Sequence, residues 1–310
     1  MHHAEQTGRA VEKLLLLEDL LFGTTLIKIL QELFTPQFTP AFEAITLLGS
    51  SEFLVGIAAV VYWCFDKRKG RLLTYILLLG AYVNFFLKLL IPSPRPPLEL
   101  RLAEKNETSF GFPSGHVQDS ITLWTSMWLS FRKRSLAIIG TVLIFAVGVS
   151  RLYLGLHNTA QVIGGVVVGL AFAGVVFLIL RHIPRQDGKI RLVPHLLFSA
   201  STVLPLVVAV LIFGVVGDGG RVAGYLLGFS IGAIFEDRYV SFSTNITNKQ
   251  RLIRIIIAGV VGGIVFGVLS DTIQGTSLLP VFLDSMLRGL TIVLIIPAVF
   301  KKIESMWLRP

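Results

Sequence analysis

The sequence has little cysteine and little charge. Cys64 is the only cysteine among 310 residues, which excludes an intramolecular disulfide and a cysteine-based metal site. Charged residues make up only 15% of the chain, whereas hydrophobic residues make up 53% and the mean hydropathy is +0.74. Soluble globular domains rarely combine so few charges with so much apolar content. These shortages argue against a soluble enzyme and against a disulfide-stabilised secreted domain.

Long polar stretches are also scarce, and a series of apolar runs fills the chain instead. Several runs extend over about 20 residues, the length that an α-helix needs to cross a bilayer. The sequence therefore predicts an all-α fold, a polytopic membrane helix bundle. We expect nine membrane-spanning helices, near residues 42–64, 72–91, 116–131, 135–150, 159–181, 192–215, 221–237, 251–269 and 281–300.

The chain divides into three predicted parts. Residues 1–40 form an amphipathic segment, because its leucines are interrupted by charges such as Glu18, which favours a helix lying in the membrane interface. Residues 41–216 carry the first six spans, and residues 217–310 carry a C-terminal extension of about three spans. We therefore expect a six-helix core with an interfacial helix before it and an extension after it.

Basic residues outnumber acidic ones and give a formal net charge of +9. They lie in short clusters between apolar runs, as in membrane loops, and no basic domain with interleaved aromatic residues stands apart from the spans. We therefore expect no nucleic-acid partner. With nine spans, the basic clusters share one side of the membrane, which the positive-inside rule makes cytoplasmic: residues 67–71, 132–134, 181–191, 238–254 and 301–302.

A short polar turn, Pro113-Ser114-Gly115-His116, stands directly before an apolar run. Serine is a common N-cap, and the start of a helix presents free backbone N–H groups at the positive end of its dipole. Such a start can bind an anion, with His116 at its edge. The cations and the second histidine that could complete the site lie in two other segments: Lys88 with Arg95, and Arg151 with His157.

Each of these residues has an ordinary structural explanation when it is taken alone. Lys88 can be a lysine that reaches from a helix end to the interface, and Arg95 can be an interfacial anchor. A lone histidine such as His157, near a helix start, usually caps the helix or is a satisfied polar residue. The conjunction favours function, because three separate segments with phosphate-binding chemistry are predicted on the side opposite the basic clusters.

The three segments together resemble the type-2 phosphatidic acid phosphatase superfamily of integral membrane lipid phosphatases. The resemblance rests on Lys88-x6-Arg95-Pro96, Pro113-Ser114-Gly115-His116 and Ser150-Arg151-x5-His157, in the order and spacing of that family. It covers about residues 40–215, so residues 216–310 lie outside the shared six-helix core. It implies a lipid phosphate substrate and contact with membrane lipids, in a plasma membrane of bacterial type. The positive-inside rule places the active site on the external face of that membrane.

The resemblance also implies a covalent phosphohistidine mechanism. His157 would be the nucleophile, and His116 would be the general acid and then the general base. The equatorial phosphoryl oxygens would be bound by Lys88, Arg95, Arg151, Ser114 and the Gly115 N–H. Positioning and electrostatics would then carry catalysis, so we expect no metal ion and no cofactor.

One position departs from the family. Where its third motif has an aspartate four residues after the nucleophilic histidine, this chain has Gln161. Gln161 can accept the hydrogen bond that orients His157, but it brings no negative charge. A structural alternative is a capping box of Asn158 and Gln161, and the two roles are compatible. Asp119, one turn after His116, is a further candidate acid, although the helix dipole alone explains an aspartate there.

Three functions fit these residues. The first is a phosphatase that hydrolyses a lipid phosphate monoester or a lipid pyrophosphate. A lipid phosphotransferase would use the same intermediate with an acceptor other than water. A catalytically degenerate member that binds or transports phospholipids would explain Gln161, but the two histidines and the three cations argue against it.

Glycines recur at four-residue spacing in the C-terminal extension. Gly224, Gly228 and Gly232 share one helix face, and Gly259, Gly263 and Gly267 share another. Such faces allow close helix packing in lipid, which is the interpretation that we favour. They are also where two copies of the chain could meet in a homo-oligomer.

Overall fold

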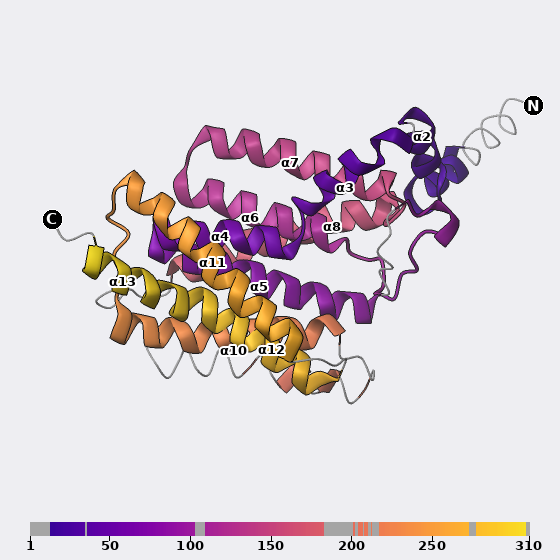
Figure 1. The fold of residues 1–310 in the computed structure, drawn as a ribbon. Helices are drawn as coiled ribbons and strands as arrows, with labels where there is room; N and C mark the ends of the chain where they lie inside the picture. The colour runs from indigo at the N-terminus through magenta and orange to yellow at the C-terminus, as the bar shows by residue number, and fades with distance from the viewer. Residues whose placement is uncertain are drawn as a thin grey trace, which may run out of the picture. The chain divides into compact units, whose positions relative to one another are not determined.

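The computed structural model describes residues 13–34, 36–102, 109–182, 217–272 and 277–307, together with residues 201, 204–206, 208, 209 and 212. All regular secondary structure in these residues is helical, so the predicted all-α membrane helix bundle is confirmed (Figure 1). The α-helices are α2 (Thr25–Leu33), α3 (Thr39–Leu47), α4 (Ser51–Cys64), α5 (Lys67–Leu90), α6 (Gly115–Phe131), α7 (Arg134–Tyr153), α8 (Thr159–His182), α10 (Gly217–Phe235), α11 (Asn248–Thr272), α12 (Leu278–Leu290) and α13 (Ile296–Trp307). Short 3-10 segments lie at Pro36–Phe38 (η1) and Leu98–Leu100 (η2), and π-helical segments lie at Glu236–Val240 (η3) and Thr291–Ile295 (η4).

Four of the described helical segments are long and apolar enough to cross a membrane: Lys67–Leu90, Arg134–Tyr153, Asn248–Leu269 and Leu278–Met306. The pair Pro36–Leu47 and Ser51–Cys64 makes a fifth if it counts as one span. Helices α6, α8 and α10 cover the predicted spans at 116–131, 159–181 and 221–237. The predicted span at 192–215 falls almost wholly outside the described residues. The count of nine spans therefore stays a prediction.

The predicted first span, residues 42–64, is not one straight helix. It is broken between α3 and α4, with a bend of 45°. Gly49 lies in the break and is pressed against α7, since a Cβ there would stand 2.6 Å from Val147 Cγ1. The Ser50 hydroxyl accepts a hydrogen bond of 3.2 Å from the Phe53 N–H and so helps to start the second helix.

The chain forms two compact units, and each unit draws on separated stretches of the sequence. The first unit consists of Met1–Leu54 and Phe86–Val175, and the second of Val55–Phe85 and Val176–Pro310. Helices α4, α5 and α8 therefore contribute residues to both units. The domain boundaries predicted after residues 40 and 216 follow the order of the chain instead and stay predictions.

The N-terminal part of the first unit is helical over residues 13–22 and again in α2. In the first of these helices the large apolar side chains from Leu14 to Leu17, and Phe22 at its end, are all more than half exposed. Exposed leucines on a short helix suit the boundary between headgroups and acyl chains. The interfacial position of this segment stays a prediction.

An aromatic core in the first unit fixes the end of α7. Phe42 of α3 and Tyr153 of α7 stack with their ring centroids 4.1 Å apart, and Leu154 and Leu156 are buried in the same cluster. The hydroxyl groups of Thr39 and Tyr153 share a hydrogen bond of 2.9 Å. This packing and the hydrogen bond therefore fix the position of the C-terminal end of α7, where the next loop begins.

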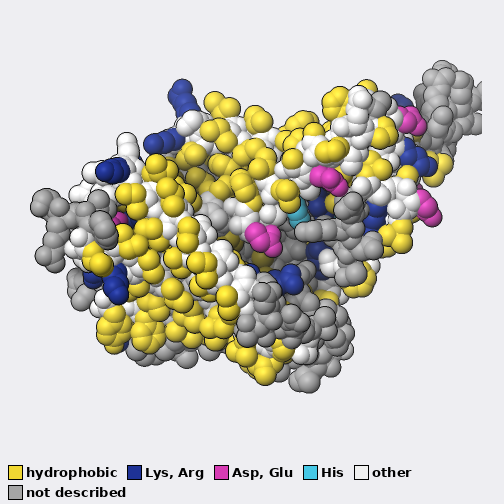
Figure 2. All heavy atoms as spheres, viewed as in Figure 1, with side chains coloured by type: hydrophobic (Ala, Val, Ile, Leu, Met, Phe, Trp, Pro, Cys, Tyr) yellow, Lys and Arg dark blue, Asp and Glu magenta, His cyan; other side chains and the backbone are white. Residues whose placement is uncertain are grey.

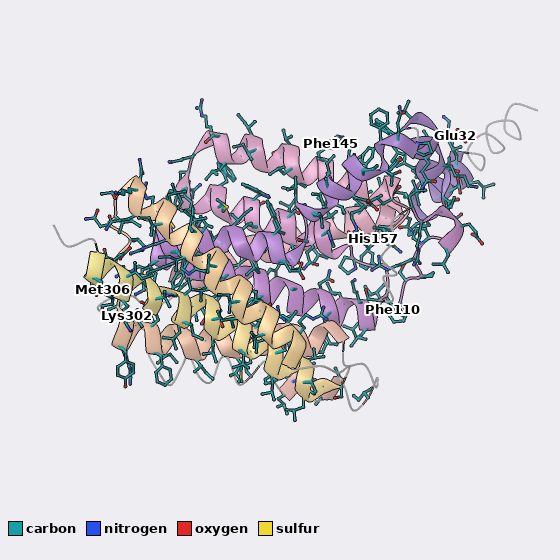
Figure 3. The ribbon with its side chains drawn as sticks, in the orientation of Figure 1. Glu32, Phe110, Phe145, His157, Lys302 and Met306 are labelled. Atoms are coloured by element: carbon teal, nitrogen blue, oxygen red, sulfur yellow. The ribbon has the colours of Figure 1, made fainter. Side chains whose placement is uncertain are left out.

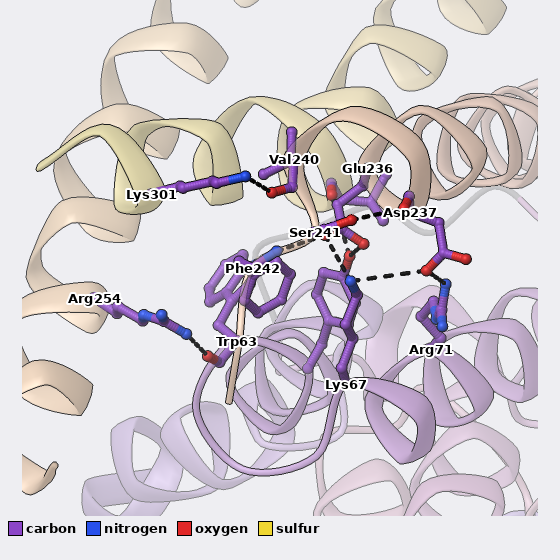
Figure 4. A network of polar contacts seen from close by, with 12 residues as sticks. Trp63, Lys67, Arg71, Glu236, Asp237, Val240, Ser241, Phe242, Arg254 and Lys301 are labelled. Atoms are coloured by element: carbon purple, nitrogen blue, oxygen red, sulfur yellow. Dashed lines mark hydrogen bonds and ion pairs between the residues drawn. The ribbon is translucent and has the colours of Figure 1, made fainter. Parts of the chain in front are cut away.

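In the second unit, the acidic residues of η3, directly after α10, meet basic residues at the start of α5 (Figure 4). Lys67 Nζ lies 2.7 Å from Glu236 Oε1, and Arg71 Nη1 lies 3.1 Å from Asp237 Oδ1. Glu236 is fully buried and also accepts a hydrogen bond of 3.1 Å from the Tyr62 hydroxyl. Because a buried charge is tolerated only when it is paired and hydrogen-bonded, this network fixes η3 to α4 and α5 within the second unit.

The glycines of α10 pack against α12 in the second unit. A Cβ at Gly224 would stand 2.3 Å from the Phe282 carbonyl oxygen, and one at Gly228 would stand 2.0 Å from the Met286 carbonyl oxygen. A Cβ at Gly232 would stand 2.4 Å from a side-chain atom of η4. Only glycine permits such an approach of two helix backbones, so the prediction of close helix packing is confirmed for this face.

Helix α11 differs, because its glycine face is open. A Cβ at Gly259, Gly263 or Gly267 would meet no atom within 4 Å in the part of the chain that the structure describes. Ile256, Val260 and other large side chains of α11 are exposed, and hydrophobic side chains cover this part of the surface in Figure 2. Such a face suits contact with lipid, and the predicted homo-oligomer stays a prediction.

Candidate active site

The residues predicted to bind and transfer phosphate all belong to the first unit. Two backbone hydrogen bonds join the segments that carry them. The Gly111 N–H donates to the Ser93 carbonyl at 2.8 Å, and the Ser114 N–H donates to the Gln161 carbonyl at 3.0 Å. The predicted residues are Lys88 in the last turn of α5, Arg95 in the loop after it, Ser114, Gly115 and His116 at the start of α6, Arg151 in the last turn of α7, His157 between α7 and α8, and Gln161 in the first turn of α8.

The loop that carries His157 is held by its backbone. Gly155 has a φ of +67°, a left-handed conformation that favours glycine, and a Cβ there would stand 2.0 Å from the Leu100 carbonyl oxygen. The N–H groups of Leu156 and His157 both donate to the Arg151 carbonyl, at 3.1 and 3.3 Å. His157 is only 1% exposed and lies among the helices of this unit (Figure 3).

The side chain of Gln161 determines the tautomer of His157. Gln161 Nε2 donates to the Pro94 carbonyl at 2.7 Å and to the Ser93 hydroxyl at 3.0 Å, so the amide oxygen must face the other way. That oxygen lies 3.1 Å from His157 Nδ1. Because an amide oxygen only accepts, Nδ1 carries the hydrogen and the lone pair of the neutral ring is on Nε2.

Gln161 also closes a capping box at the start of α8. Its backbone N–H donates to Asn158 Oδ1 at 3.0 Å, and its Oε1 accepts from the Asn158 N–H at 3.2 Å. The two alternatives from the sequence, an orienting contact to His157 and a helix cap, are therefore both present. Gln161 is 1% exposed, so all of these contacts are shielded from water.

Arg95 lies against Nε2 of His157. Its Nη1 is 3.2 Å from His157 Nε2 and also donates to the Leu156 carbonyl at 2.9 Å. Its Nε donates to the Ser109 carbonyl at 2.7 Å. A phosphate group bound by this guanidinium would therefore meet the lone pair of the imidazole.

Lys88 and Arg151 extend the positive charge around His157. Lys88 Nζ donates to the Ser109 hydroxyl at 3.0 Å, and Arg151, which is 2% exposed, donates from Nη1 to Thr46 Oγ1 at 3.3 Å. Burial holds the pKa of His157 well below its usual value of 6.5, and the positive charges of Arg151, Arg95 and Lys88 lower that pKa further. The imidazole is therefore neutral at pH 7, the form in which an imidazole can act as a nucleophile.

Ser114 is the N-cap of α6, but its hydroxyl makes no capping hydrogen bond. Its side chain is fully buried, and Oγ has no hydrogen-bond partner among the residues that the structure describes. Other hydroxyls of α6, such as that of Ser126, also have no partner among the described residues, so the position of Ser114 at the start of the helix is what suits an anion. His116 follows in the first turn of α6 and is half-buried.

The other candidate acid, Asp119, faces a different helix. It is 5% exposed, and its Oδ2 accepts a hydrogen bond of 3.0 Å from the Ser51 hydroxyl at the start of α4. Nowhere in the described ranges do three His, Cys, Asp or Glu side chains gather as a metal site requires. The metal-free site stays a prediction.

Sequence reasoning missed three polar residues that hold the predicted ones. The Ser93 hydroxyl accepts a hydrogen bond from Gln161, and the Thr46 hydroxyl accepts one from Arg151. The Ser109 hydroxyl accepts hydrogen bonds from both Lys88 and Arg95. Each is a common polar residue in a loop or at the end of a helix, and each contact joins residues far apart in the chain except the one between Ser109 and Arg95. Spacing in the sequence contains no signal for such contacts.

Comparison with known proteins agrees with the motifs. The profile of the PAP2 superfamily matches residues 69–185, and the profile of a PAP2 superfamily phosphatase transmembrane extension matches residues 220–306. Phosphatidylglycerophosphatase B of Bacillus subtilis is 31% identical over 148 residues, which cover 44% of this chain and 71% of that protein. The chain belongs to the PAP2 superfamily.

Other PAP2 relatives match shorter parts of their own length. Mouse sphingosine-1-phosphate phosphatase 2 is 26% identical over 39% of this chain and 36% of its own length. Lipid A 4'-phosphatase of Bacteroides thetaiotaomicron is 38% identical over 24% of this chain and 32% of its own length. The chain thus spans about a third of these two relatives. A crystal structure of a PAP2-type phosphatidylglycerolphosphate phosphatase from Bacillus subtilis is 27% identical, with a TM-score of 0.45, and covers 52% of this chain and 86% of that one.

Membership of the PAP2 superfamily confirms two predictions. The resemblance to the family is confirmed, and so is the enzyme class, a phosphoric monoester hydrolase of the lipid phosphate phosphatase type. The profile match at residues 220–306 also agrees with a multi-pass integral membrane protein. The roles of individual residues rest on the geometry above and stay proposals.

Proposed function

We propose that this PAP2 protein is an integral membrane phosphatase that hydrolyses a lipid phosphate monoester or a lipid pyrophosphate through a phosphohistidine intermediate, without a metal ion. The observation that carries the proposal is the hydrogen bonding of His157. Gln161 holds the hydrogen on Nδ1, so Nε2 carries the lone pair and accepts a hydrogen bond of 3.2 Å from Arg95 Nη1. A phosphate that binds Arg95 would therefore be placed for attack by Nε2.

In the first step, Nε2 of His157 attacks phosphorus, and the bond between phosphorus and the leaving oxygen breaks. His116 gives its proton to that oxygen, so that the lipid leaves as an alcohol, or as a lipid monophosphate when the substrate is a pyrophosphate. Lys88, Arg95 and Arg151 neutralise the equatorial oxygens as charge develops on them. The Ser114 hydroxyl and the N–H groups at the start of α6 add neutral donors.

In the second step, water attacks the phosphorus of the phosphohistidine. His116 takes the proton from that water, and the bond between phosphorus and Nε2 breaks. The products are inorganic phosphate and neutral His157. Gln161 gives the positively charged phosphohistidine no counter-charge, which favours its breakdown over its accumulation.

The substrate class follows from what the relatives have in common. The names of the Bacillus, mouse and Bacteroides proteins refer to phosphatidylglycerophosphate, sphingosine-1-phosphate and lipid A. All three lipids carry a phosphate monoester on an apolar body. We therefore propose a phosphate monoester of a membrane lipid as the first substrate to test.

The orientation of helices in the first unit supports an external site. Helix α6 runs from Gly115 in the site to Phe131, and α7 returns from Arg134 to Tyr153 beside the site. The basic turn at residues 132–134 therefore lies at the other end of both helices. If the positive-inside rule holds for that turn, the site opens to the external side of a plasma membrane of bacterial type.

Release of inorganic phosphate by the purified protein in detergent tests the proposal. The panel contains phosphatidylglycerol phosphate, sphingosine-1-phosphate, phosphatidic acid and a polyprenyl pyrophosphate, with glycerol 3-phosphate as a soluble control. We expect release from at least one lipid in the presence of EDTA, and none from the His157→Gln variant. Transfer of the phosphoryl group to an added alcohol without phosphate release would favour the phosphotransferase, and no reaction with any lipid would contradict the proposal.

A further inference from the structure

Ser109 joins two of the cations around His157. Its Oγ accepts hydrogen bonds from Lys88 Nζ at 3.0 Å and from Arg95 Nη2 at 3.1 Å. Its backbone carbonyl accepts a third, from Arg95 Nε at 2.7 Å. The two cations belong to different segments of the first unit, so one serine holds both of them.

The hydrogen of the Ser109 hydroxyl has a direction that follows from these contacts. A serine hydroxyl has two acceptor lone pairs and one donor hydrogen. Lys88 and Arg95 occupy both lone pairs, so the O–H must point elsewhere. Among the residues that the structure describes, no acceptor takes this hydrogen in a hydrogen bond. Two positive neighbours also polarise the O–H bond and make it a stronger donor to an anion.

We infer that Ser109 is a further phosphate-binding residue, whose hydroxyl donates to a phosphoryl oxygen between Lys88 and Arg95. The inference rests on the proposed function, because it requires a phosphoryl group at these cations. The hydroxyl would add one neutral donor to the positive charge that the two cations supply. Ser109 lies outside the three motifs that carry the family resemblance.

The contacts also show which substitution isolates the hydroxyl. Ser109→Ala removes Oγ but keeps the carbonyl that binds Arg95 Nε, so the guanidinium retains an anchor on this loop. Ser109→Thr keeps the hydroxyl. Ser126→Ala is a matched control, because Ser126 is a fully buried serine of α6 in the same unit whose Oγ has no partner among the described residues.

Binding of orthovanadate, an analogue of the pentacoordinate phosphoryl group, tests the inference. We measure its inhibition constant and the rise in melting temperature that it produces in detergent, for the wild type and the three variants. Ser109→Ala should raise the inhibition constant about 10-fold or more, as expected for a lost hydrogen bond to a charged group, and should reduce the vanadate-induced rise in melting temperature. Ser109→Thr should stay within about threefold of the wild type, and Ser126→Ala should be unchanged. The melting temperature without vanadate should be the same in the wild type and Ser109→Thr, because the threonine hydroxyl can still accept from Lys88 and Arg95.

Two results would overturn the inference. One is an unchanged inhibition constant in Ser109→Ala while the wild type is inhibited and releases phosphate from a lipid. The other is a lower melting temperature of Ser109→Ala without vanadate, with no recovery of binding in Ser109→Thr, which would show a purely structural role. Failure of the proposed function gives a different pattern, since the wild type itself would then neither bind vanadate nor release phosphate.

Discussion

Replacement of Gln161 by leucine tests how the nucleophile is oriented. The Gln161 side chain is buried, and its Oε1 accepts from His157 Nδ1 at 3.1 Å. Leucine has a similar size but no acceptor, so it leaves the Nδ1–H of a buried ring without a partner. An unsatisfied buried donor costs about 1–3 kcal/mol. If that cost falls on the reactive tautomer, the rate of phosphoenzyme formation falls by about 5- to 150-fold.

Two matched variants distinguish the orienting contact between Gln161 and His157 from the helix cap at Asn158 and from the effect of an added charge. Asn158→Ala removes the acceptor for the Gln161 N–H and the donor to the Phe22 carbonyl, but it leaves the contact between Gln161 and His157. It should lower stability by about 0.5–2 kcal/mol, as the loss of an N-cap does, with little effect on the chemical step. Gln161→Asp keeps an acceptor and adds a negative charge, so the phosphoenzyme should form at least as fast as in the wild type and break down more slowly.

The assay is a single turnover of a short-chain lipid phosphate, quenched in alkali, in which phosphohistidine survives. The rate of phosphoenzyme formation is compared across the wild type and the three variants at equal fractions of folded protein. Equal rates for Gln161→Leu and the wild type would refute the orienting role and leave Gln161 as a helix cap. A rate loss in Asn158→Ala as large as that in Gln161→Leu would show that the loop as a whole, and not the tautomer, had been disturbed.

Three further predictions follow from the same structure. His116→Ala should slow both formation and hydrolysis of the phosphoenzyme, by about 10²- to 10⁴-fold, because the proposed mechanism uses this one imidazole as the acid and then as the base. Rapid-quench kinetics that show only one step affected would contradict this. Because the pKa of His157 is lowered in the folded protein, the unfolded chain binds a proton first as the pH falls through 6.5. The free energy of unfolding should then fall by up to about 1.4 kcal/mol for each pH unit below 6.5. Denaturation measured from pH 7 to 5 should show a smaller slope for His157→Gln, and the same slope in both proteins would contradict the lowered pKa of His157. Gly228→Ala should lower the melting temperature, because its Cβ would stand 2.0 Å from the Met286 carbonyl oxygen. Gly263→Ala should leave the melting temperature unchanged or raise it, because its Cβ would meet no atom within 4 Å in the described residues. Equal effects of the two substitutions would refute the packing of α10 against α12.

Local spacing allowed part of the site to be predicted. Asn158 and Gln161 stand three residues apart, and His157 and Gln161 stand four apart at the start of a helix, so their contacts follow from helix geometry. The apolar runs likewise predicted the helices, because length and composition decide whether a segment can span a membrane. The position of the Lys88, Arg95 and Arg151 charges near His157 was predicted through the family resemblance and not through physics alone.

Contacts between distant segments could not be predicted in the same way. The break between α3 and α4 depends on the approach of Gly49 to Val147, almost 100 residues later in the sequence. Ser109 and Thr46 are ordinary hydroxyl residues in the sequence, and they gain importance only because the fold brings them to Lys88 and Arg151. Such positions require the packed structure, since neither periodicity nor motif spacing marks them.

Identification of the phosphorylated residue in a trapped intermediate is the most direct test of the mechanism. The wild type and His157→Gln are mixed with a short-chain lipid phosphate, quenched in alkali during the first turnover, and digested for mass spectrometry under conditions that preserve phosphohistidine. We expect the phosphoryl group on His157 of the wild type, at a level that rises and then falls within one turnover, and no phosphorylated peptide from His157→Gln. A phosphoryl group on another residue, or phosphate release by His157→Gln at a rate near that of the wild type, would contradict the nucleophilic role of His157.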